Sequence, residues 1–351
     1  MRIGINALYF IPGGVGGTEI YLRELLAGLA EIDRQNQYFV FTNRETGPDL
    51  VPRQPNFQQV PQPVRAKFRP ARILWEQTGL PLAARRFRID AMFNPGFTCP
   101  AWACCPNVTV FHDLQHKRHP EYFRWFDLPF WRLLLWLSAR RSRELISVSR
   151  VTAADLQHFY GRESTVIHHG VEREFFRIAE RRTPGDYLLC VSTLHPHKNL
   201  DRLVRVYGMS GQLPHLVITG LRGHAAAELE KLAGPCVRFT GWVPRDELYS
   251  MFRGARAFIY PSKFEGFGMP VLEAMAAGIP VACSDIPPLR EIADGCAIFF
   301  DPEDDHAMQE AIIRVVQDNS LIQTARQRAA AFSWQRSARA TLDCIERAVT
   351  R

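Results

Sequence analysis

The chain alternates short apolar, β-branched stretches with helical ones, and this alternation restricts the fold more than any other feature of the sequence. In the first half the strand-like stretches are IGINAL (3–8), YFVFTN (38–43), VTVFHD (108–113), LISVS (145–149) and STVIHHG (164–170). Helical patterns lie between them at 18–30 and around 122–142. Strands that alternate with helices form βαβ units, which build parallel sheets.

The second half repeats the alternation with DYLLCVS (186–192), HLVITG (215–220), VRFTGW (237–242), AFIYPS (257–262), PVACSD (280–285) and AIFFD (297–301). Between the halves, residues 170–185 form a charged link that contains proline and glycine. The 351 residues also exceed the roughly 150 that one domain usually takes. We therefore predict an α/β protein with two parallel-sheet domains.

Residues 43–72 break the alternation. They hold six prolines and the basic residues Arg53, Arg65, Lys67, Arg69 and Arg72. Long irregular loops in compact domains tend to be functional or mobile, and a tolerated insertion is the alternative. We therefore expect residues 43–72 to be the least regular part of the chain.

Charge and cysteine usage narrow the class of protein. A net charge of +7 and a pI near 9.1 suit anionic small molecules, an anionic membrane surface or nucleic acid. No nucleic-acid-binding motif accompanies the arginines, so we expect no nucleic-acid partner. The eight cysteines include no Cys-x-x-Cys and several lie in apolar runs, which is typical of reduced core cysteines. The start MRIGINALYF reads as a first strand, and no stretch reaches the roughly 20 apolar residues of a membrane span, so we expect a cytoplasmic protein.

Two stretches of the first half suggest ligand contacts. The glycine-rich GGVGGTE (13–19) runs into an amphipathic helix, whose first N–H groups attract anions, although a plain turn fits equally well. It is not a dinucleotide fingerprint, because no acidic strand end follows about 20 residues later, so a dehydrogenase is disfavoured. His112 follows an apolar strand, at the carboxyl end where open α/β sheets bind ligands. We interpret His116 and His119 as solvated loop histidines, since no cysteine or acidic cluster joins them as metal ligands.

The apolar stretch RWFDLPFWRLLLWLSARRSRE (124–144) has two interpretations. The favoured one is a helix packed against the sheet, with a cationic C-terminal end that the helix dipole stabilises. The alternative is an interfacial helix that lies on a membrane surface.

Lys198 lies between His197 and Asn199, where a helix starts after a strand. A lysine there can meet a phosphate as a point charge, contributing about 1.5–3 kcal/mol per charge-assisted hydrogen bond. A solvated surface lysine is the alternative.

The segment KFEGFGMPVLEAMAAGIPV (263–281) is the most specific. Pro270 suits the first turn of a helix that Gly278 and Pro280 terminate, and Glu265 and Glu273 flank its start. The amides around the glycines would face a ligand at the end of the preceding strand. Carboxylates can accept hydrogen bonds from sugar hydroxyls, while amides and a lysine meet phosphate. The alternative is a helix-dipole carboxylate with a satisfied core glutamate.

This segment reads E-x(7)-E and resembles the retaining, group 1 (family 4) glycosyltransferases. The other motifs of that family follow in order: GGVGGTE near the start, HD at 112, SVS at 147, HHGV at 168, HKNL at 197, FTGWVP at 239 and AAGIPVACSD at 276. The stretches ILWEQTGLP (73–81), NPG (94–96) and STLHPHKNL (192–200) are most similar to bacterial mannosyl- and rhamnosyltransferases of surface polysaccharides.

The resemblance implies two Rossmann-like domains that face each other across a cleft, the GT-B architecture. It implies an acceptor-side domain over 1–170 and a nucleotide-sugar donor domain over 171–332. The final helix, within 333–351, would pack back towards the N-terminal domain.

The resemblance also assigns site residues. Glu265 would contact sugar hydroxyls, Glu273 the ribose and Lys198 the diphosphate, with His112 near the transferred sugar; His112, Lys198 and Glu265 form the catalytic set. Trp242 and Val243 would lie near the base, and Gly16 and Gly17 near the phosphate. The implied donor-binding set is Gly16, Gly17, Thr193, His197, Trp242, Val243, Gly266, Phe267, Gly268, Met269, Pro270, Val271 and Glu273.

The family chemistry implies attack from the face that the nucleotide leaves, with the donor phosphate taking the acceptor's proton. No Asp-x-Asp sequence is present to hold a divalent ion, and we expect neither a metal nor a cofactor. The favoured donor is GDP-mannose, with a UDP-sugar as the alternative, and the acceptor is a glycan or lipid-linked glycan, with peripheral contact at the inner face of the membrane. A sugar-nucleotide epimerase and a non-catalytic nucleotide-sugar-binding subunit are the competing hypotheses.

One departure concerns positive charge. Many family members carry an arginine before the lysine, where this chain has Thr193-Leu194, and His197 stands where close relatives often have Arg-Lys. Either another basic residue such as Arg222 supplies the second charge, or the leaving group is less stabilised.

Overall fold

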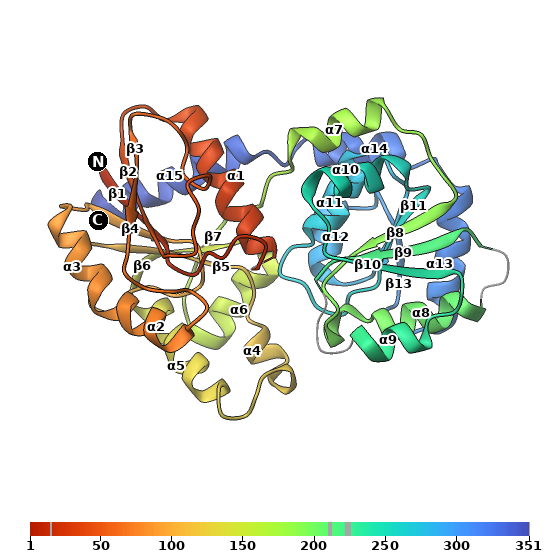
Figure 1. The fold of residues 1–351 in the computed structure, drawn as a ribbon, viewed down its shortest axis with the longest axis horizontal. Helices are drawn as coiled ribbons and strands as arrows, with labels where there is room; N and C mark the ends of the chain where they lie inside the picture. The colour runs from red at the N-terminus through yellow and green to blue at the C-terminus, as the bar shows by residue number, and fades with distance from the viewer. Residues whose placement is uncertain (15, 210–212, 222–225, 351) are drawn as a thin grey trace. The chain divides into compact units, whose positions relative to one another are not determined.

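The chain folds into two units. The computed structural model describes residues 1–14, 16–209, 213–221 and 226–350. Unit 1 comprises Met1–Gly170 and Trp334–Arg351, and unit 2 comprises Val171–Ser333. Each is built around one parallel sheet with helices on both faces, which confirms the predicted α/β class (Figure 1).

The sheet of unit 1 has the strand order β3-β2-β1-β4-β5-β6-β7, and every pair is parallel. Most of its strands are buried nearly throughout, because helices cover both faces. The strands are β1 (Arg2–Ala7), β2 (Gln37–Thr42), β3 (Phe57–Pro61), β4 (Ala91–Asn94), β5 (Asn107–Phe111), β6 (Ser142–Ser147) and β7 (Thr165–Val166).

Helices α1 (Gly17–Ile32) and α15 (Trp334–Thr350) pack together on unit 1. They approach so closely that a Cβ at Gly28 would lie 2.8 Å from the carbonyl oxygen of Trp334. The last helix of the chain is therefore part of the N-terminal unit. The other helices of this unit are α2 (Arg69–Gln77), α3 (Gly79–Arg86), α4 (Gln115–Arg118), α5 (Leu128–Arg141) and α6 (Arg150–Tyr160), with the 3-10 turn η1 (Pro120–Tyr122).

The least regular stretch of the sequence, residues 43–72, contains two regular elements, strand β3 and the start of α2. β3 lies at the edge of the sheet, where Pro61 at its end is tolerated. The helix predicted around 122–142 begins only at Leu128, because 123–127 form turns whose aromatic side chains reach the surface.

The sheet of unit 2 has the order β10-β9-β8-β11-β12-β13, again entirely parallel. The chain first builds strands in one direction and then returns to build on the other side of β8, which is the Rossmann order. The direction reverses between β8 and β11 here, and between β1 and β4 in unit 1. The strands are β8 (Tyr187–Val191), β9 (His215–Thr219), β10 (Val237–Gly241), β11 (Ala257–Tyr260), β12 (Val281–Ser284) and β13 (Ile298–Phe300).

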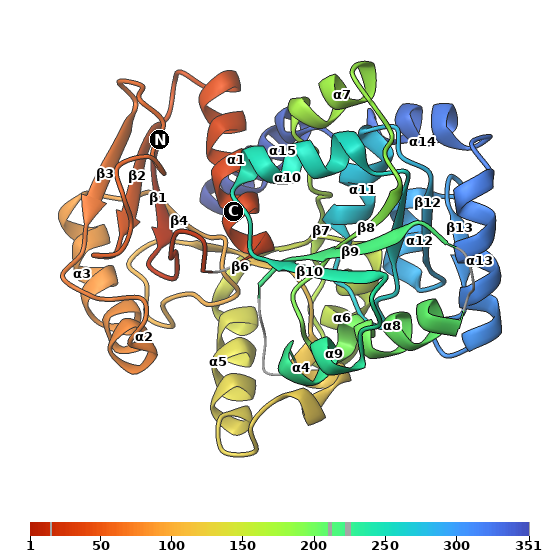
Figure 2. The ribbon, with the colours of Figure 1, turned by 45° about the vertical axis from the view of Figure 1, so that its right-hand side comes forward.

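Helices cover both faces of this second sheet (Figures 1 and 2). One face packs on α8 (Leu200–Met209), α9 (Ala226–Leu232) and α13 (Asp305–Gln317), through a buried core that includes Cys190, Leu203 and Ile312. The remaining helices are α7 (Arg173–Glu180), α10 (Arg245–Gly254), α11 (Met269–Ala276), α12 (Pro287–Ala293) and α14 (Ile322–Ala329), with the 3-10 turn η2 (Pro196–Lys198).

All eight cysteines are free, but the prediction that they are core residues holds only in part. Cys99, Cys190, Cys283 and Cys344 are buried, whereas Cys104 and Cys236 are exposed. Within the described ranges, no helix combines the length and apolarity that a membrane crossing requires.

Candidate active site

In unit 2, two loops that carry predicted site residues emerge beside each other. β8 and β11 are neighbours in the sheet, and the loops after them hold Lys198 and Glu265 respectively. The strand order reverses at this point, and ligands of open α/β sheets bind in the crevice outside such strand ends.

Lys198 and Glu265 form an ion pair. Nζ of Lys198 lies 2.6 Å from Oε1 of Glu265, and both side chains are largely buried, at 15% and 10% exposure. Nζ also donates to the Tyr260 hydroxyl at 3.2 Å. Burial and the Glu265 carboxylate hold the pKa of Tyr260 well above its ordinary value, so this hydroxyl stays neutral. Lys198 therefore supplies a positive charge whose position is fixed by two partners.

Backbone contacts hold the two loops together. The N–H of Lys263 donates to the carbonyl of His197 at 2.8 Å. The Ser262 hydroxyl is 3.3 Å from the same carbonyl and 3.0 Å from that of Phe264. The residues just before Lys198 and Glu265 are thus joined, so the ion pair does not depend on two independent loops.

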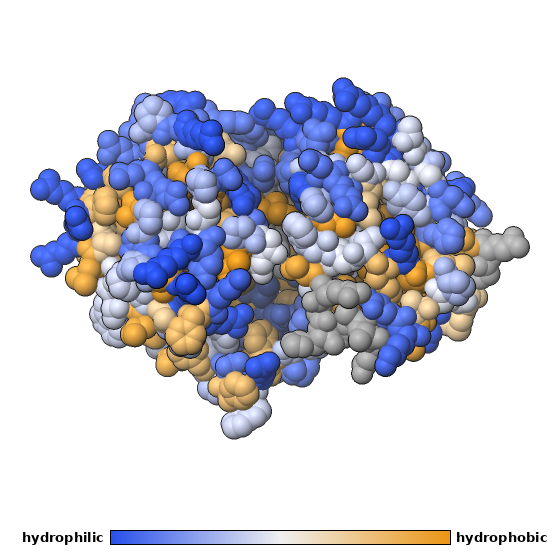
Figure 3. All heavy atoms as spheres, in the orientation of Figure 1, coloured by the Kyte–Doolittle hydropathy of each residue, from blue (hydrophilic) through white to orange (hydrophobic). Residues whose placement is uncertain are grey.

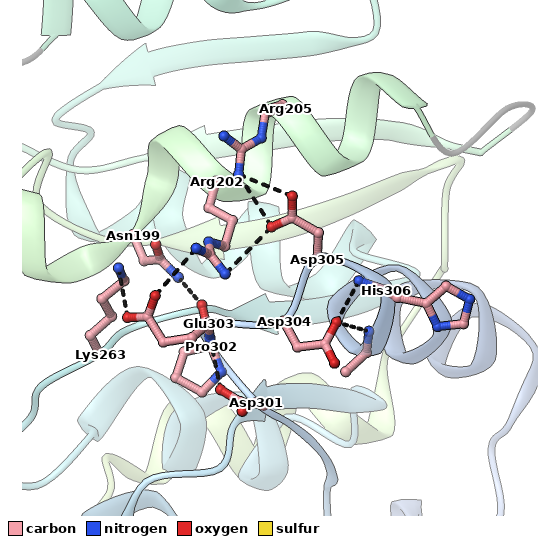
Figure 4. A network of polar contacts seen from close by, with 11 residues as sticks. Asn199, Arg202, Arg205, Lys263, Asp301, Pro302, Glu303, Asp304, Asp305 and His306 are labelled. Carbon is pink, nitrogen blue, oxygen red and sulfur yellow. Dashed lines mark hydrogen bonds and ion pairs between the residues drawn. The ribbon is translucent and has the colours of Figure 1, made fainter.

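A polar network beside these loops adds a second connection (Figure 4). The Glu303 carboxylate pairs with Lys263 at 2.8 Å and with Arg202 at 3.2 Å. The Asn199 amide donates to the carbonyl of Pro302 at 2.9 Å. Surface ion pairs of this kind contribute about 0–1 kcal/mol each, so the network orients the loops more than it stabilises the fold.

The start of α11 has the geometry that the sequence predicts. Gly268 has φ 106°, in the left-handed region, and a Cβ there would lie 2.4 Å from Cδ2 of Leu289. Pro270 lies in the first turn of the helix. The first N–H groups of a helix have no intrahelical acceptor and favour anions. The N–H of Val271, unlike a free N–H at a helix start, already donates to the Gly268 carbonyl at 3.1 Å, and the Val271 side chain is buried.

Glu273 lies within α11 and is buried. Its Oε1 accepts from Nη2 of Arg245 at 3.1 Å. Burial raises the pKa of Glu273 to about 7, with Glu172 adding to the rise and Arg245 opposing it. After burial, the nearby Glu265 carboxylate raises the pKa of Tyr260 most, and Glu273 adds a smaller rise.

The sequence suggested Thr193, His197 and Arg222 as positions that bear on a second positive charge beside Lys198. Thr193 is exposed, and Arg222 lies outside the described residues. Nδ1 of His197 is 2.6 Å from Nδ1 of His195, so a second imidazole adjoins Lys198. No role for His195 was predicted from the sequence.

Trp242 follows β10, the outermost strand of the sheet. Because all the strands are parallel, it lies at the same carboxyl end of the sheet as the loops after β8 and β11. Its side chain is 57% exposed, while Val243 is half-buried. An exposed indole at the ligand-binding edge offers an apolar face on which a planar base can stack.

In unit 1, His112 follows β5 and is buried. Its Nε2 is 2.8 Å from the Pro95 carbonyl, which can only accept, so Nε2 carries the proton. Burial lowers the pKa of His112 to about 4. The ring is therefore a neutral imidazole whose Nδ1 can accept a hydrogen bond.

The glycine-rich loop follows β1, next to the reversal point of this sheet. Gly16 has φ 57° and caps α1, and Gly17 is the first residue of the helix. The N–H of Gly13 donates to Oε2 of Glu19 at 2.7 Å, and Glu19 also pairs with Arg23 at 3.0 Å. A carboxylate from the first turn thus already occupies one N–H of the loop.

His116 corrects one prediction. It is not solvated but buried, with Nε2 2.7 Å from the Tyr160 hydroxyl, and burial lowers its pKa to about 4. His119 lies 2.9 Å from Glu121. Among the described residues, no three histidine, cysteine or acidic side chains gather as a metal-binding group.

Each unit has a Rossmann-like parallel sheet, and candidate ligand-binding residues lie in the loops at its reversal point, an arrangement found in the two-domain fold called GT-B. Sucrose-phosphate synthase from Thermosynechococcus elongatus matches this fold with a TM-score of 0.79, over 99% of this chain and 98% of its own, at 18% sequence identity. The predicted fold class is confirmed.

The chain belongs to the group 1 glycosyltransferases. Residues 171–332 match the family model described as glycosyl transferases group 1, and residues 15–175 match glycosyltransferase family 4. The chain is 35% identical to O-antigen chain mannosyltransferase B of Escherichia coli over 268 residues, 68% of this chain and 70% of that protein. It is 29% identical to O-antigen chain mannosyltransferase RfbU of Salmonella typhimurium over 218 residues, 60% of each. The prediction of a glycosyltransferase is confirmed.

Proposed function

We propose that this glycosyltransferase moves mannose, with retention of configuration and without a metal ion, from GDP-mannose to a glycan or lipid-linked glycan of a surface polysaccharide. The observation that carries the proposal is the buried Lys198–Glu265 ion pair at the reversal point of unit 2, with Glu273 buried in the helix that follows the Glu265 loop. The names of the O-antigen mannosyltransferases support the sugar.

The chemical groups match the parts of a nucleotide sugar. Lys198 and the N-terminus of α11 suit the diphosphate, because both offer positive charge to an anion. Glu265 is held beside Lys198, where its carboxylate can accept from hydroxyls of the sugar attached to that diphosphate. Glu273, deeper in α11, suits the ribose hydroxyls, and Trp242 suits the base.

Transfer requires that the bond from the anomeric carbon to the diphosphate breaks while a bond to the acceptor hydroxyl forms on the same face. The acceptor's proton passes to an oxygen of the departing diphosphate, so the chain needs no separate base. Lys198 and the α11 amides stabilise the charge that develops on this leaving group, which is electrostatic preorganisation. This cationic set is the reason why we propose that no divalent ion is needed.

His112 of unit 1 suits a hydroxyl of the transferred sugar. Its Nε2–H is already given to Pro95, and the ring is neutral at physiological pH because its pKa is about 4. Nδ1 therefore acts as an acceptor and not as a proton donor.

A transfer assay tests the proposal. The enzyme is incubated with GDP-mannose and a lipid-linked glycan in the presence of EDTA, and the anomeric configuration of the product is read by NMR. We expect an α-linked mannose, as in the donor. Transfer from UDP-sugars alone would overturn the donor, an inverted product the stereochemistry, and loss of activity in EDTA the metal independence. Formation of an epimer without acceptor would favour an epimerase.

We also propose that unit 1 contacts an anionic membrane surface through the aromatic surface, which we define as Trp125, Phe126, Phe130, Leu133 and Trp136. Their exposed fractions are 84%, 56%, 49%, 55% and 40%. The opposite face of α5 is buried through Leu134, Leu135, Ser138 and Ala139. The helix thus packs on its sheet and still presents apolar groups outward, so the two interpretations of the sequence are compatible.

The charges around the aromatic surface match anionic lipids. Arg124, Arg132, Arg140, Arg141 and Arg143 are all exposed. Apolar and hydrophilic groups lie side by side at the end of unit 1 that carries α5 (Figure 3). Aromatic side chains flanked by arginines are typical of segments that lie in the headgroup region of a bilayer.

Vesicle sedimentation tests this contact. We expect the chain to bind phosphatidylglycerol vesicles but not phosphatidylcholine vesicles, and Trp125→Ser with Phe130→Ser to weaken that binding. Ile313→Ser is the matched control, because Ile313 is 40% exposed but lies on α13 of unit 2. Equal binding of the double variant and the control would contradict the proposal.

A further inference from the structure

Arg245, the first residue of α10, lies between two carboxylates. Its Nη2 contacts Oε1 of Glu172 and lies 3.1 Å from Oε1 of Glu273. The second oxygen of Glu172 accepts from the Tyr249 hydroxyl. One guanidinium nitrogen is therefore shared by Glu172 and Glu273.

The cluster is mostly withdrawn from solvent. The side chains of Arg245, Glu172 and Glu273 are 30%, 14% and 8% exposed. The guanidinium carbon lies 5.3 Å from the Phe175 ring and 5.2 Å from that of Tyr249, so aromatic faces fix its position. One cation therefore stabilises the charges of two carboxylates, and a stronger contact with one carboxylate weakens its contact with the other.

Glu172 belongs to the segment in which the chain passes from unit 1 into unit 2, since the units divide between Gly170 and Val171. The N–H of Val171 donates to the carbonyl of Phe332 at 3.3 Å. Phe332 precedes the second passage, between Ser333 and Trp334, and its ring lies 6.1 Å from that of Phe267. Phe332 therefore contacts the loop before α11, and Glu172 is connected to Glu273 of α11 through Arg245.

We propose that Arg245 is a positioning residue for Glu273, and that Glu172 sets how much of Arg245's charge Glu273 receives. The inference rests on the proposed function, in which Glu273 binds the ribose of the donor. The first segment that links the two units thereby adjusts donor affinity through a contact that takes no part in the chemistry.

The protonation state of Glu273 determines how it can bind a ribose. A carboxylate accepts hydrogen bonds from two ribose hydroxyls, whereas a protonated carboxyl loses part of that capacity. The groups that act on Glu273 are Arg245 of α10 and Glu172 before α7, and Glu273 acts in turn on Tyr260 at the end of β11. Helices α12 and α14 and strand β12 also pack on α11, but no charged group of theirs among the described residues shifts its pKa.

Substitution of Arg245 and substitution of Glu172 are therefore expected to shift the pKa of Glu273 in opposite directions. Arg245→Gln removes the cation and leaves Glu273 facing Glu172, so the pKa of Glu273 rises. As the pH is lowered, donor binding is then lost at a higher pH than in wild type. Glu172→Gln releases Arg245 entirely to Glu273, so the pKa of Glu273 falls and binding persists to a lower pH. Arg245→Lys keeps the charge and should restore part of the wild-type profile.

The experiment measures the dissociation constants of GDP and GDP-mannose by calorimetry from pH 5.5 to pH 8.5, on the full chain. Wild type, the three variants and Arg256→Gln are compared. Arg256 is the matched control, because its contact with Asp186 is 3.7 Å long and exposed. We expect midpoints that move up for Arg245→Gln and down for Glu172→Gln. For a one-unit upward shift from about 7, affinity at pH 7 should fall about fivefold, because the ionised fraction of Glu273 falls from about one half to about one eleventh. The kcat at saturating donor should change little.

The outcomes separate the two proposals. If wild type binds and the midpoints of Arg245→Gln and Glu172→Gln do not move, or move in the same direction, the positioning inference is wrong. If wild type binds neither ligand, the proposed function itself fails. Circular dichroism identifies a variant that does not fold, and Glu172→Gln, which removes no buried cation, then decides alone.

Discussion

Lys198 is the residue on which the proposed leaving-group chemistry depends most. Lys198→Ala should lower turnover by about a hundredfold or more, the scale on which removal of one preorganised charge acts. Lys231→Ala is the control, since Lys231 is an exposed lysine of the same unit. Initial rates with saturating donor and acceptor measure the effect. If Lys198→Ala keeps most of the activity, Lys198 does not hold the diphosphate.

A second prediction concerns Glu273 and the way in which the stability of the fold depends on pH. Its pKa is raised from 4.5 to about 7, so the folded chain holds the protonated form more tightly than the unfolded chain does. The resulting stability is fully present below pH 4.5 and is lost as pH rises through about 7. Glu273→Gln has no such loss.

The melting temperature of Glu273→Gln, relative to wild type, should therefore increase between pH 5 and pH 8. Differential scanning calorimetry of both proteins across this range measures the difference. A difference that stays constant with pH would show that Glu273 does not titrate in this window.

At the residue scale, the sequence could indicate groups that belong to a motif but not their partners. Lys198, Glu265 and Glu273 were found because they stand in recognisable spacings near strand ends. Arg245 was missed, because its partners Glu172 and Glu273 are 73 and 28 positions away along the chain. His116 was misjudged for the same reason, since Tyr160 is 44 positions away.

At the scale of elements, the start of α11 depends on Gly268. A Cβ at this position would meet Leu289 at 2.4 Å, and the backbone φ of 106° is one that other residues rarely adopt. Gly268→Ala should cost about 1–3 kcal/mol and raise the KM for donor, because the amides at the helix start must shift.

Gly208→Ala is the matched control for this prediction. Gly208 lies within α8 and an added Cβ there meets nothing within 4 Å, so alanine should stabilise by about 0.5–1 kcal/mol. Urea unfolding of both variants measures the two changes. Equal effects of the two substitutions would contradict the geometry at the start of α11.

Strands that are buried on both faces could be predicted from the sequence, whereas an edge strand and an exposed helix start were harder to predict. β5 and β11 read as continuous apolar runs because helices cover both faces of a parallel sheet. β3 (FQQVP) lies at the edge, so its polar residues concealed it. The start of α5 was misplaced because Trp125 and Phe126 are exposed, against the assumption that an aromatic run is part of a packed helix.

At the scale of the whole molecule, the chain passes between the units twice, at Gly170–Val171 and at Ser333–Trp334. The composition of 170–185 indicated the first passage, because a charged segment with proline and glycine interrupts the strands. Nothing in the composition indicates the second, and only the family resemblance suggested that the last helix returns. Its contact with α1 at Gly28 is long-range and leaves no local pattern.

The central claim is that unit 2 binds a guanosine diphosphate sugar at the Lys198–Glu265–Glu273 site, and thermal unfolding in the presence of nucleotides tests it most directly. A ligand at a hundred times its dissociation constant adds about 2.7 kcal/mol to the free energy of unfolding, which is readily measured as a shift in Tm. We predict that GDP and GDP-mannose raise Tm in EDTA, that UDP and UDP-glucose do not, and that Lys198→Ala removes the shift. No shift with either GDP compound, or an equal shift in Lys198→Ala, would contradict the account.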